Sequence, residues 1–142
     1  MNPSDIFEYA NEGMKWLVLG GGTYMVSLAT LIGSTGVCAT FSQKIKTQEE
    51  LVSIVNEEAK RLGVDKSIVS TLHDELEACS GKREDDSLYV LHVGGFLAKR
   101  NVVRHELYHI YKGDCDKKYN LLRYLFIEEP RAILYDTFGI KL

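Results

Sequence analysis

The chain has 142 residues, of which 45% are hydrophobic, and a formal net charge of -3. This length supplies one hydrophobic core but not two full domains. No basic cluster interleaves with aromatic residues, so nucleic acid is not an expected partner. The three cysteines, Cys38, Cys79 and Cys115, lack CxxC spacing, which argues against a disulfide framework and favours an intracellular protein.

The character of the sequence changes near residue 42. Residues 16–41 contain no charged side chain, and about 20 mainly apolar residues suffice to span a bilayer. We therefore expect an N-terminal tail over residues 1–15, a transmembrane helix or a buried hydrophobic segment over residues 16–41, and one folded domain over residues 42–142. Basic residues follow the apolar run and acidic residues precede it, so a spanning helix would place the domain in the cytoplasm. The alternative is a soluble cytoplasmic protein.

The first part of the domain predicts one helix and two strands. Thr47 and Glu50 fit a capping box, and apolar residues then recur at helical spacing up to residue 62. Residues 68–72 and 87–93 are rich in β-forming side chains, and the second run ends at a glycine pair.

The next segment carries the most specific motif of the chain. Residues 96–112 predict a helix through a core, ended by Gly113, and residues 105–109 read HELYH. His105 and His109 are four apart and so share one helical face, where both rings can bind one zinc ion. Glu106 stands one position further round the helix, beside the expected site of a water molecule.

A zinc site needs a third protein ligand and an open position for water. The downstream acidic candidates are Asp114, Asp116, Glu128, Glu129 and Asp136. Asp114 and Asp116 follow the glycine that ends the motif helix, so we expect them to face water. Residues 121–126 predict a helix. Pro130 is tolerated only in the first turn of a helix, so a further helix should begin close to Glu128.

From residue 47 to residue 142 the chain resembles the gluzincin metallopeptidases, and in size the single-domain minigluzincins. The likeness rests on HELYH and on Glu129, which is followed three residues later by the small Ala132. The resemblance implies an α+β zincin-like domain with a short β-sheet, an HExxH helix and a C-terminal glutamate helix, here preceded by the expected transmembrane helix. It also implies that the strand of residues 87–93 lies along the cleft and pairs with an extended substrate.

The same resemblance assigns the site residues. It carries over the two motif histidines and Glu129 as ligands of a Zn²⁺ ion, with Glu128 as second choice. Many relatives place Asn or Asp four residues after the ligand to hold a histidine, whereas this chain has Ile133. Asp136 could supply that carboxylate from the same helical face. A solvent-exposed acid near the C-terminus is the alternative interpretation of Asp136.

These residues predict a zinc-dependent peptidase that acts on a peptide or protein substrate. Glu106 would accept a proton from water and pass it to the leaving amine, as general base and then acid. A Tyr or His near the metal should stabilise the oxyanion. The sequence does not choose among the candidates, for each of which packing is the favoured interpretation: Tyr119, Tyr124, Tyr135, His73 and His92.

Two other interpretations stay open. One is a latent or regulatory zinc-binding protein of the same fold, blocked by its own C-terminal residues 138–142. The other is a membrane interaction protein without catalysis, in which HELYH is coincidental. The sequence does not predict the oligomeric state.

Overall fold

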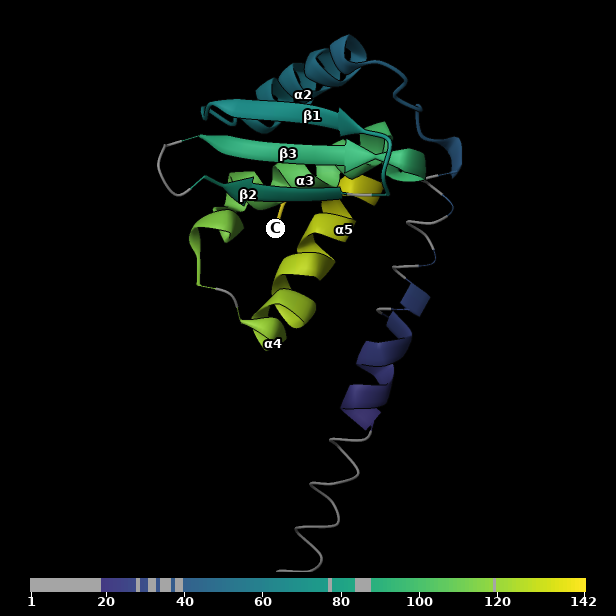
Figure 1. Cartoon of the computed structure of the whole chain (residues 1–142). Coiled ribbons are helices and arrows are strands. Elements are labelled where there is room, and N and C mark those ends of the chain that lie inside the picture. The colour runs from purple at the N-terminus through teal and green to yellow at the C-terminus, as the bar shows by residue number, and fades with distance from the viewer. Residues whose placement is uncertain are drawn as a thin grey trace, which may run out of the picture.

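The computed structural model describes residues 19–27, 29–30, 33, 37, 40–76, 78–83, 88–118 and 120–142. Over these residues the fold is α+β, as expected, with helices packed on a small sheet (Figure 1). The elements after residue 47 are α2 (Gln48–Leu62), β1 (Ile68–His73), β2 (Ala78–Lys82), β3 (Tyr89–Gly94), η1 (Gly95–Leu97), α3 (Arg100–Lys112), η2 (Asp114–Asp116), α4 (Leu121–Arg123), η3 (Tyr124–Glu128) and α5 (Glu129–Phe138).

Helix α2 confirms the expected helix of residues 47–62. The Thr47 hydroxyl accepts a hydrogen bond from the Glu50 amide (3.2 Å), and Gly63 ends the helix in the left-handed region. The apolar residues of the predicted pattern form one buried face, made of Leu51, Ile54, Val55 and Leu62. This face joins the main core with α3 and the sheet.

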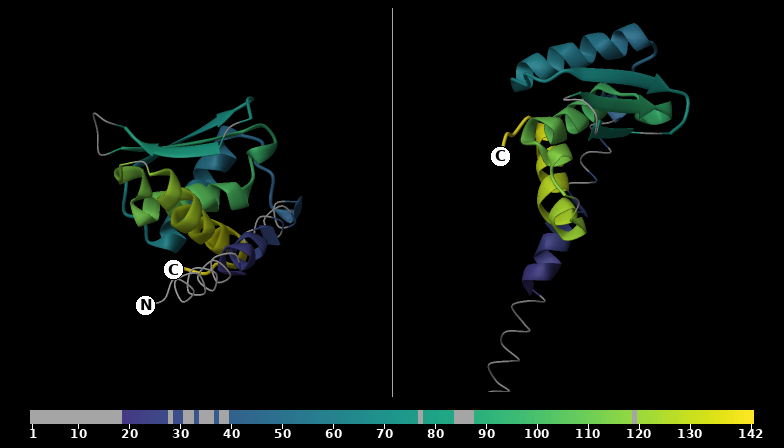
Figure 2. Two further views of the ribbon diagram at one scale, coloured as in Figure 1. Left: turned by 90° about the horizontal axis from the view of Figure 1, so that it is seen from below. Right: turned by 60° about the vertical axis from the view of Figure 1, so that its left-hand side comes forward.

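The sheet has the strand order β1-β3-β2, with β1 parallel and β2 antiparallel to β3. Leu91 and Val93 on β3 are fully buried under the helices. Figure 2 shows the strands on one side of the domain and the helices on the other. The expected strands of residues 68–72 and 87–93 are confirmed as β1 and β3, with small differences at their ends. Strand β2 was not predicted.

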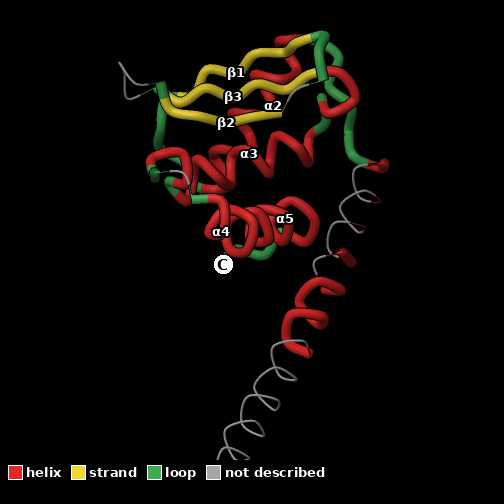
Figure 3. The backbone as a smooth tube through the Cα atoms, turned by 60° about the horizontal axis from the view of Figure 1, so that its bottom comes forward, coloured by secondary structure: helices red, strands yellow, loops and turns green. Residues whose placement is uncertain are grey.

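Helix α3 lies at the centre of the domain, between the sheet and α5 (Figure 3). The helix predicted over residues 96–112 begins at Arg100, because η1 first turns the chain from β3 into α3. Val103, Leu107 and Ile110 are fully buried. Gly113 ends α3 with φ 65°, a left-handed conformation that glycine adopts without steric cost.

The predicted helix of residues 121–126 corresponds to α4 and η3, and the further helix expected after it corresponds to α5. The backbone stays right-handed helical from α4 through η3 into α5, and η3 is a π-helical turn. The Glu129 amide bonds to the carbonyl of Tyr124, five residues back. This wider turn precedes Pro130, which has no amide hydrogen and would crowd the carbonyl four residues before it. Helix α5 begins at Glu129, which confirms the predicted start close to Glu128, and the π-helical turn joins it to the helical residues before it.

The N-terminal apolar segment is described only in part. Residues 19–27 are helical and mostly exposed, whereas several positions of the predicted 16–41 span and the whole 1–15 tail lie outside the described residues. In the part of the chain that is described, no helix combines the length and apolar character required to cross a bilayer. The segment joins the domain where the Ser42 hydroxyl accepts from the Asn101 amide (3.0 Å) at the start of α3.

Candidate metal centre

Three side chains from two helices converge on one point. His105 and His109 project from one face of α3, and Glu129 opens α5, which packs against α3. Nε2 of His105 lies 3.3 Å from Nε2 of His109 and 3.4 Å from Oε2 of Glu129. Nε2 of His109 lies 3.3 Å from Oε1 of Glu129. The three predicted ligands thus form a group that could hold a metal ion.

These separations match the edges of a tetrahedral zinc shell. Zinc bonds to histidine nitrogen and carboxylate oxygen are about 2.0–2.2 Å long, which makes the ligand–ligand distance in a tetrahedron about 3.3–3.6 Å. The observed 3.3, 3.4 and 3.3 Å fit that range.

Each histidine is oriented by a carboxylate at its other nitrogen. Nδ1 of His105 lies 3.1 Å from Asp136, and Nδ1 of His109 lies 3.2 Å from Asp114. A carboxylate accepts hydrogen bonds, so each Nδ1 carries a proton, and in a neutral ring each Nε2 turns its lone pair toward Glu129. With both rings neutral, three acceptors would converge with no donor among them. A cation would stabilise this arrangement, and the donor set fits zinc.

Asp136 is buried and contacts His105, which was one of the two interpretations of this residue from the sequence. The expectation that Asp114 faces water is wrong, since its side chain is 5% exposed. The short turn η2 folds back after Gly113 and directs Asp114 toward His109, where Lys117 and Arg131 also pair with it. Burial raises the pKa of Asp114, but hydrogen bonds with Lys117 and His109 outweigh burial and lower it.

The structure distinguishes between the two adjacent glutamates. Glu128 accepts a hydrogen bond from the Arg123 guanidinium (2.8 Å) and lies outside the three-residue group. Glu129 belongs to the group. Burial raises the pKa of Glu129, but hydrogen bonds with His105 and His109 outweigh burial and hold it well below the ordinary range.

The electrostatics of the metal-free cluster favour a bound positive charge. Burial lowers the pKa of His105, but hydrogen bonds with Asp136 and Glu129 outweigh burial and raise it to about 10. Without metal, His105 therefore holds a proton near neutral pH. A zinc ion would take the place of this proton, because histidine binds metal in its neutral form.

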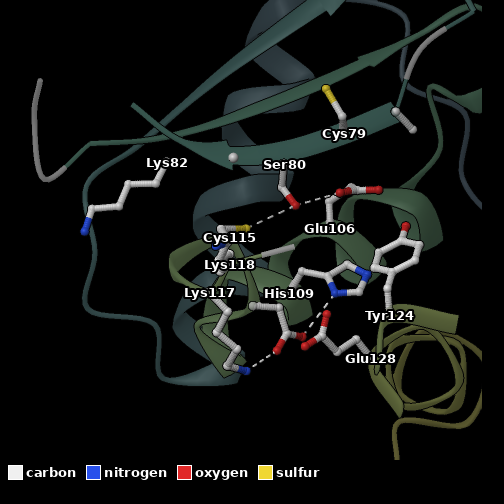
Figure 4. A pocket seen from close by; sticks show the side chains of 13 residues that line it. Cys79, Ser80, Lys82, Glu106, His109, Cys115, Lys117, Lys118, Tyr124 and Glu128 are labelled. Atoms are coloured by element: carbon white, nitrogen blue, oxygen red, sulfur yellow. Dashed lines mark hydrogen bonds and ion pairs between the residues drawn. The ribbon is translucent and has the colours of Figure 1, made fainter. Parts of the chain in front are cut away.

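Glu106 lies beside the cluster in a pocket of about 430 Å³ that α3 and β2 line together (Figure 4). The Ser80 hydroxyl, on β2, donates a hydrogen bond to Oε2 of Glu106 (2.7 Å). Cys115 lies next to Ser80, with its sulfur 3.8 Å from the hydroxyl oxygen. Sequence reasoning missed Ser80, because nothing in the short polar run of β2 marked it as a strand beside the motif helix.

The strand beside the pocket is not the one that the resemblance implied. Strand β3 was expected to pair with substrate, but it is the central strand and both its edges are occupied. Strand β2 is an edge strand, and all its residues line the pocket. The expected placement of β3 along the cleft is therefore wrong, and β2 borders the pocket instead.

Of the five oxyanion candidates, the structure brings Tyr124 to the site. Its ring stacks near that of His109, with centroids 6.2 Å apart, and it forms a hydrogen bond with Glu129. Tyr135 stacks on Tyr108 in the core (4.9 Å). His73 and His92 bond to each other on the sheet (2.9 Å), and residue 119 lies outside the described residues.

The C-terminal residues 138–142 do not line the pocket. The chain end lies against another face of α3, where the Tyr108 hydroxyl donates to the Leu142 carbonyl (2.9 Å). Lys141 lies over the ring of Tyr111 on the same helix. This placement gives no support to a plug formed by the C-terminal residues.

Comparisons with protein-family models, with curated proteins and with solved structures find no match for this chain.

Proposed function

We propose that this protein is a zinc-dependent peptidase. The observation that carries the proposal is the trio of His105, His109 and Glu129, with ligand atoms 3.3–3.4 Å apart and Glu106 in the adjoining pocket. Two nitrogen donors and one oxygen donor leave a fourth position open, which is typical of catalytic rather than structural zinc sites.

The side chains around the trio have complementary roles. Bound zinc would supply a Lewis acid that polarises a peptide carbonyl and acidifies water. Glu106 accepts the proton of the attacking water and returns it to the leaving amine. Ser80 holds Oε2 of Glu106, which leaves Oε1 to take the proton. The Tyr124 hydroxyl, close to Glu129, is positioned to donate to the developing oxyanion.

Strand β2 supports a peptide as the substrate. It borders the pocket, and in the described part of the chain its outer edge pairs with no other strand. An extended peptide could add to this edge by backbone hydrogen bonds, with its scissile bond beside the metal. We infer that substrate binds antiparallel or parallel to β2 as an added strand.

Zinc analysis of the purified full chain tests the ligand set. We expect one zinc per chain in the parent protein and in Glu128→Gln, and loss of zinc in Glu129→Gln. The two substitutions change neighbouring residues in the same way, so the comparison separates a ligand from a nearby acid. A parent protein without zinc affinity, or equal zinc in both variants, would contradict the proposed centre.

Peptidase activity is tested separately with fluorescently labelled casein. Glu106→Gln should retain zinc and lose cleavage by a factor of at least about 100, the typical contribution of a general base. Cleavage by Glu106→Gln at the parent rate would sink the peptidase proposal while leaving the zinc centre intact.

The hydrogen bond from Ser80 on β2 to Glu106 favours a second candidate function. Because Ser80 occupies one oxygen of Glu106, this state could be a latent zinc-binding form in which β2 must shift before turnover begins. In that case the parent protein would bind zinc and leave casein intact, and Ser80→Ala would increase cleavage.

A further inference from the structure

An arginine directly before the first motif histidine reaches across to α5. The Arg104 side chain is largely buried, and its Nη2 donates a hydrogen bond to the Tyr135 carbonyl (3.1 Å). The next residue on each helix makes the next contact, because Nδ1 of His105 lies 3.1 Å from the Asp136 carboxylate. Two consecutive residues of α3 therefore contact two consecutive residues of α5.

The Tyr135 carbonyl lies in the last turn of α5. It also accepts a hydrogen bond from the amide of Gly139 (2.8 Å), the residue that ends this helix. The C-terminal end of a helix carries a partial negative charge, which a guanidinium stabilises. The Arg104 guanidinium also lies over the Tyr135 ring, 5.1 Å from its centroid. These contacts hold the end of α5 in one position and one rotation, and Asp136 projects from that turn.

A buried carboxylate on α2 holds Arg104 in turn. Glu58 is fully buried, and its Oε2 lies 3.7 Å from Nε of Arg104. The other oxygen of Glu58 accepts a hydrogen bond from Nε of Arg100 (2.7 Å), one helical turn before Arg104. A buried charge without a partner is costly, so Glu58 and Arg104 restrain each other. The contacts thus form a chain from α2 through α3 to the end of α5.

We propose that Arg104 is a positioning residue of the metal centre. Held by Glu58, it fixes the end of α5 so that Asp136 meets Nδ1 of His105. The contact between Asp136 and His105 exists without an ion, so this part of the proposal is independent of zinc. The effect of Arg104 on zinc affinity rests on the proposed function.

Competition of the full chain with a chromophoric chelator tests the effect on zinc. Arg104→Met should weaken zinc binding on the order of tenfold, since loss of the carboxylate that orients a ligand costs about 10- to 100-fold. The matched control is Arg61→Met. Arg61 also lies near Glu58 (3.9 Å), but its side chain is 61% exposed. Equal zinc affinity in the parent and in Arg104→Met would overturn the proposal.

A double-mutant cycle shows whether Arg104 acts through Asp136. In an Asp136→Asn background, Arg104→Met should weaken zinc binding by less than about twofold, because the contact that Arg104 maintains is already weakened. A general loss of stability would act in both backgrounds alike. Losses that multiply would therefore overturn the proposal.

Proton NMR of the chelator-treated protein tests the positioning without zinc. A hydrogen-bonded ring N–H that is shielded from water exchanges slowly and gives a resolved signal. The His105 signal is assigned by its absence from His105→Gln. It should be present in the parent and in Arg61→Met, and lost in Arg104→Met. An unchanged signal in Arg104→Met would overturn the proposal. A parent that binds no zinc but shows this pattern would contradict the proposed function and leave the positioning role intact.

Circular dichroism shows whether each variant folds. If Arg104→Met does not fold, Arg104→Met/Glu58→Gln takes its place, because it removes the buried charge that the single substitution leaves without this partner. We expect the same loss of zinc affinity and of the His105 signal in this variant. Parent-like values of both would overturn the proposal.

Discussion

Asp136 and Asp114 orient the two histidines of the proposed metal centre without belonging to its candidate ligands. Each carboxylate meets a histidine Nδ1, one from α5 and one from the turn after α3. These contacts set the tautomer and the ring orientation before any ion arrives. The packing of α5 on α3 and the turn η2 therefore orient both histidine rings without an ion.

Asp136→Asn should weaken zinc binding by about 10- to 100-fold, the usual effect of removing such a carboxylate. Asparagine has a similar size but no charge, so it would hold the His105 ring proton only through a weaker, neutral hydrogen bond. Competition with a chromophoric chelator measures the affinity. Asp65→Asn, an exposed acid on the loop after α2, is the control and should bind as the parent does. Unchanged affinity in Asp136→Asn would contradict the orienting role.

Ser80 should influence turnover more than substrate binding. Ser80→Ala removes the hydroxyl that holds Glu106, so the carboxylate can rotate away from its productive position. We expect kcat to fall several-fold with little change in KM, and Ser80→Thr to restore most of the rate because it keeps the hydroxyl. An increase in rate would instead support the latent form in which β2 restrains Glu106.

Zinc binding should release protons over a defined pH range. The pKa of His105 in the metal-free cluster is raised to about 10, so this ring is protonated at about pH 8 and must lose that proton to bind zinc. We expect close to one proton released per zinc at about pH 8, and less as the pH rises through 10. Titration calorimetry in two buffers of different ionisation enthalpy measures the release, and equal heats in both would contradict it.

At the scale of elements, α3 connects the core to the site. One face carries the histidines, while Leu107 is fully buried in the main core. Leu107→Ala should lower the free energy of unfolding of the metal-free protein by about 2–5 kcal/mol, through lost burial and a cavity. Leu122→Ala on α4 removes the same atoms from an exposed position. It should change the free energy of unfolding by less than about 0.5 kcal/mol. Urea denaturation with chelator present measures both.

The elements also show what the sequence could predict. Helix α2 and the placement of both histidines follow from local spacing, so these predictions did not need the rest of the chain. Glu129 was predicted as a metal ligand only through a family resemblance, because no local pattern links it to α3. Asp114 was predicted wrongly, since its environment depends on how η2 folds back. Strand β2 and Ser80 depend on pairing with β3, which the short run Ala78–Lys82 does not reveal.

For the whole molecule, the proposed metal centre would join helices that are otherwise held together by side-chain packing. Its candidate ligands come from α3 and α5, and α3 is also connected to the N-terminal segment through Ser42. An ion at the centre would therefore resist separation of the C-terminal helix from the core.

Zinc should accordingly raise the thermal stability of the whole domain. At a free zinc concentration about a thousand times Kd, binding to the folded state alone adds about 4 kcal/mol. For a chain of this size that corresponds to a rise in Tm of roughly 10 °C, measured by differential scanning calorimetry with zinc and with chelator. Glu129→Gln should show the same Tm under both conditions, because α5 no longer supplies a ligand. Glu128→Gln should keep the full zinc-dependent rise in Tm. Loss of that rise would indicate that Glu128, and not Glu129, is the ligand.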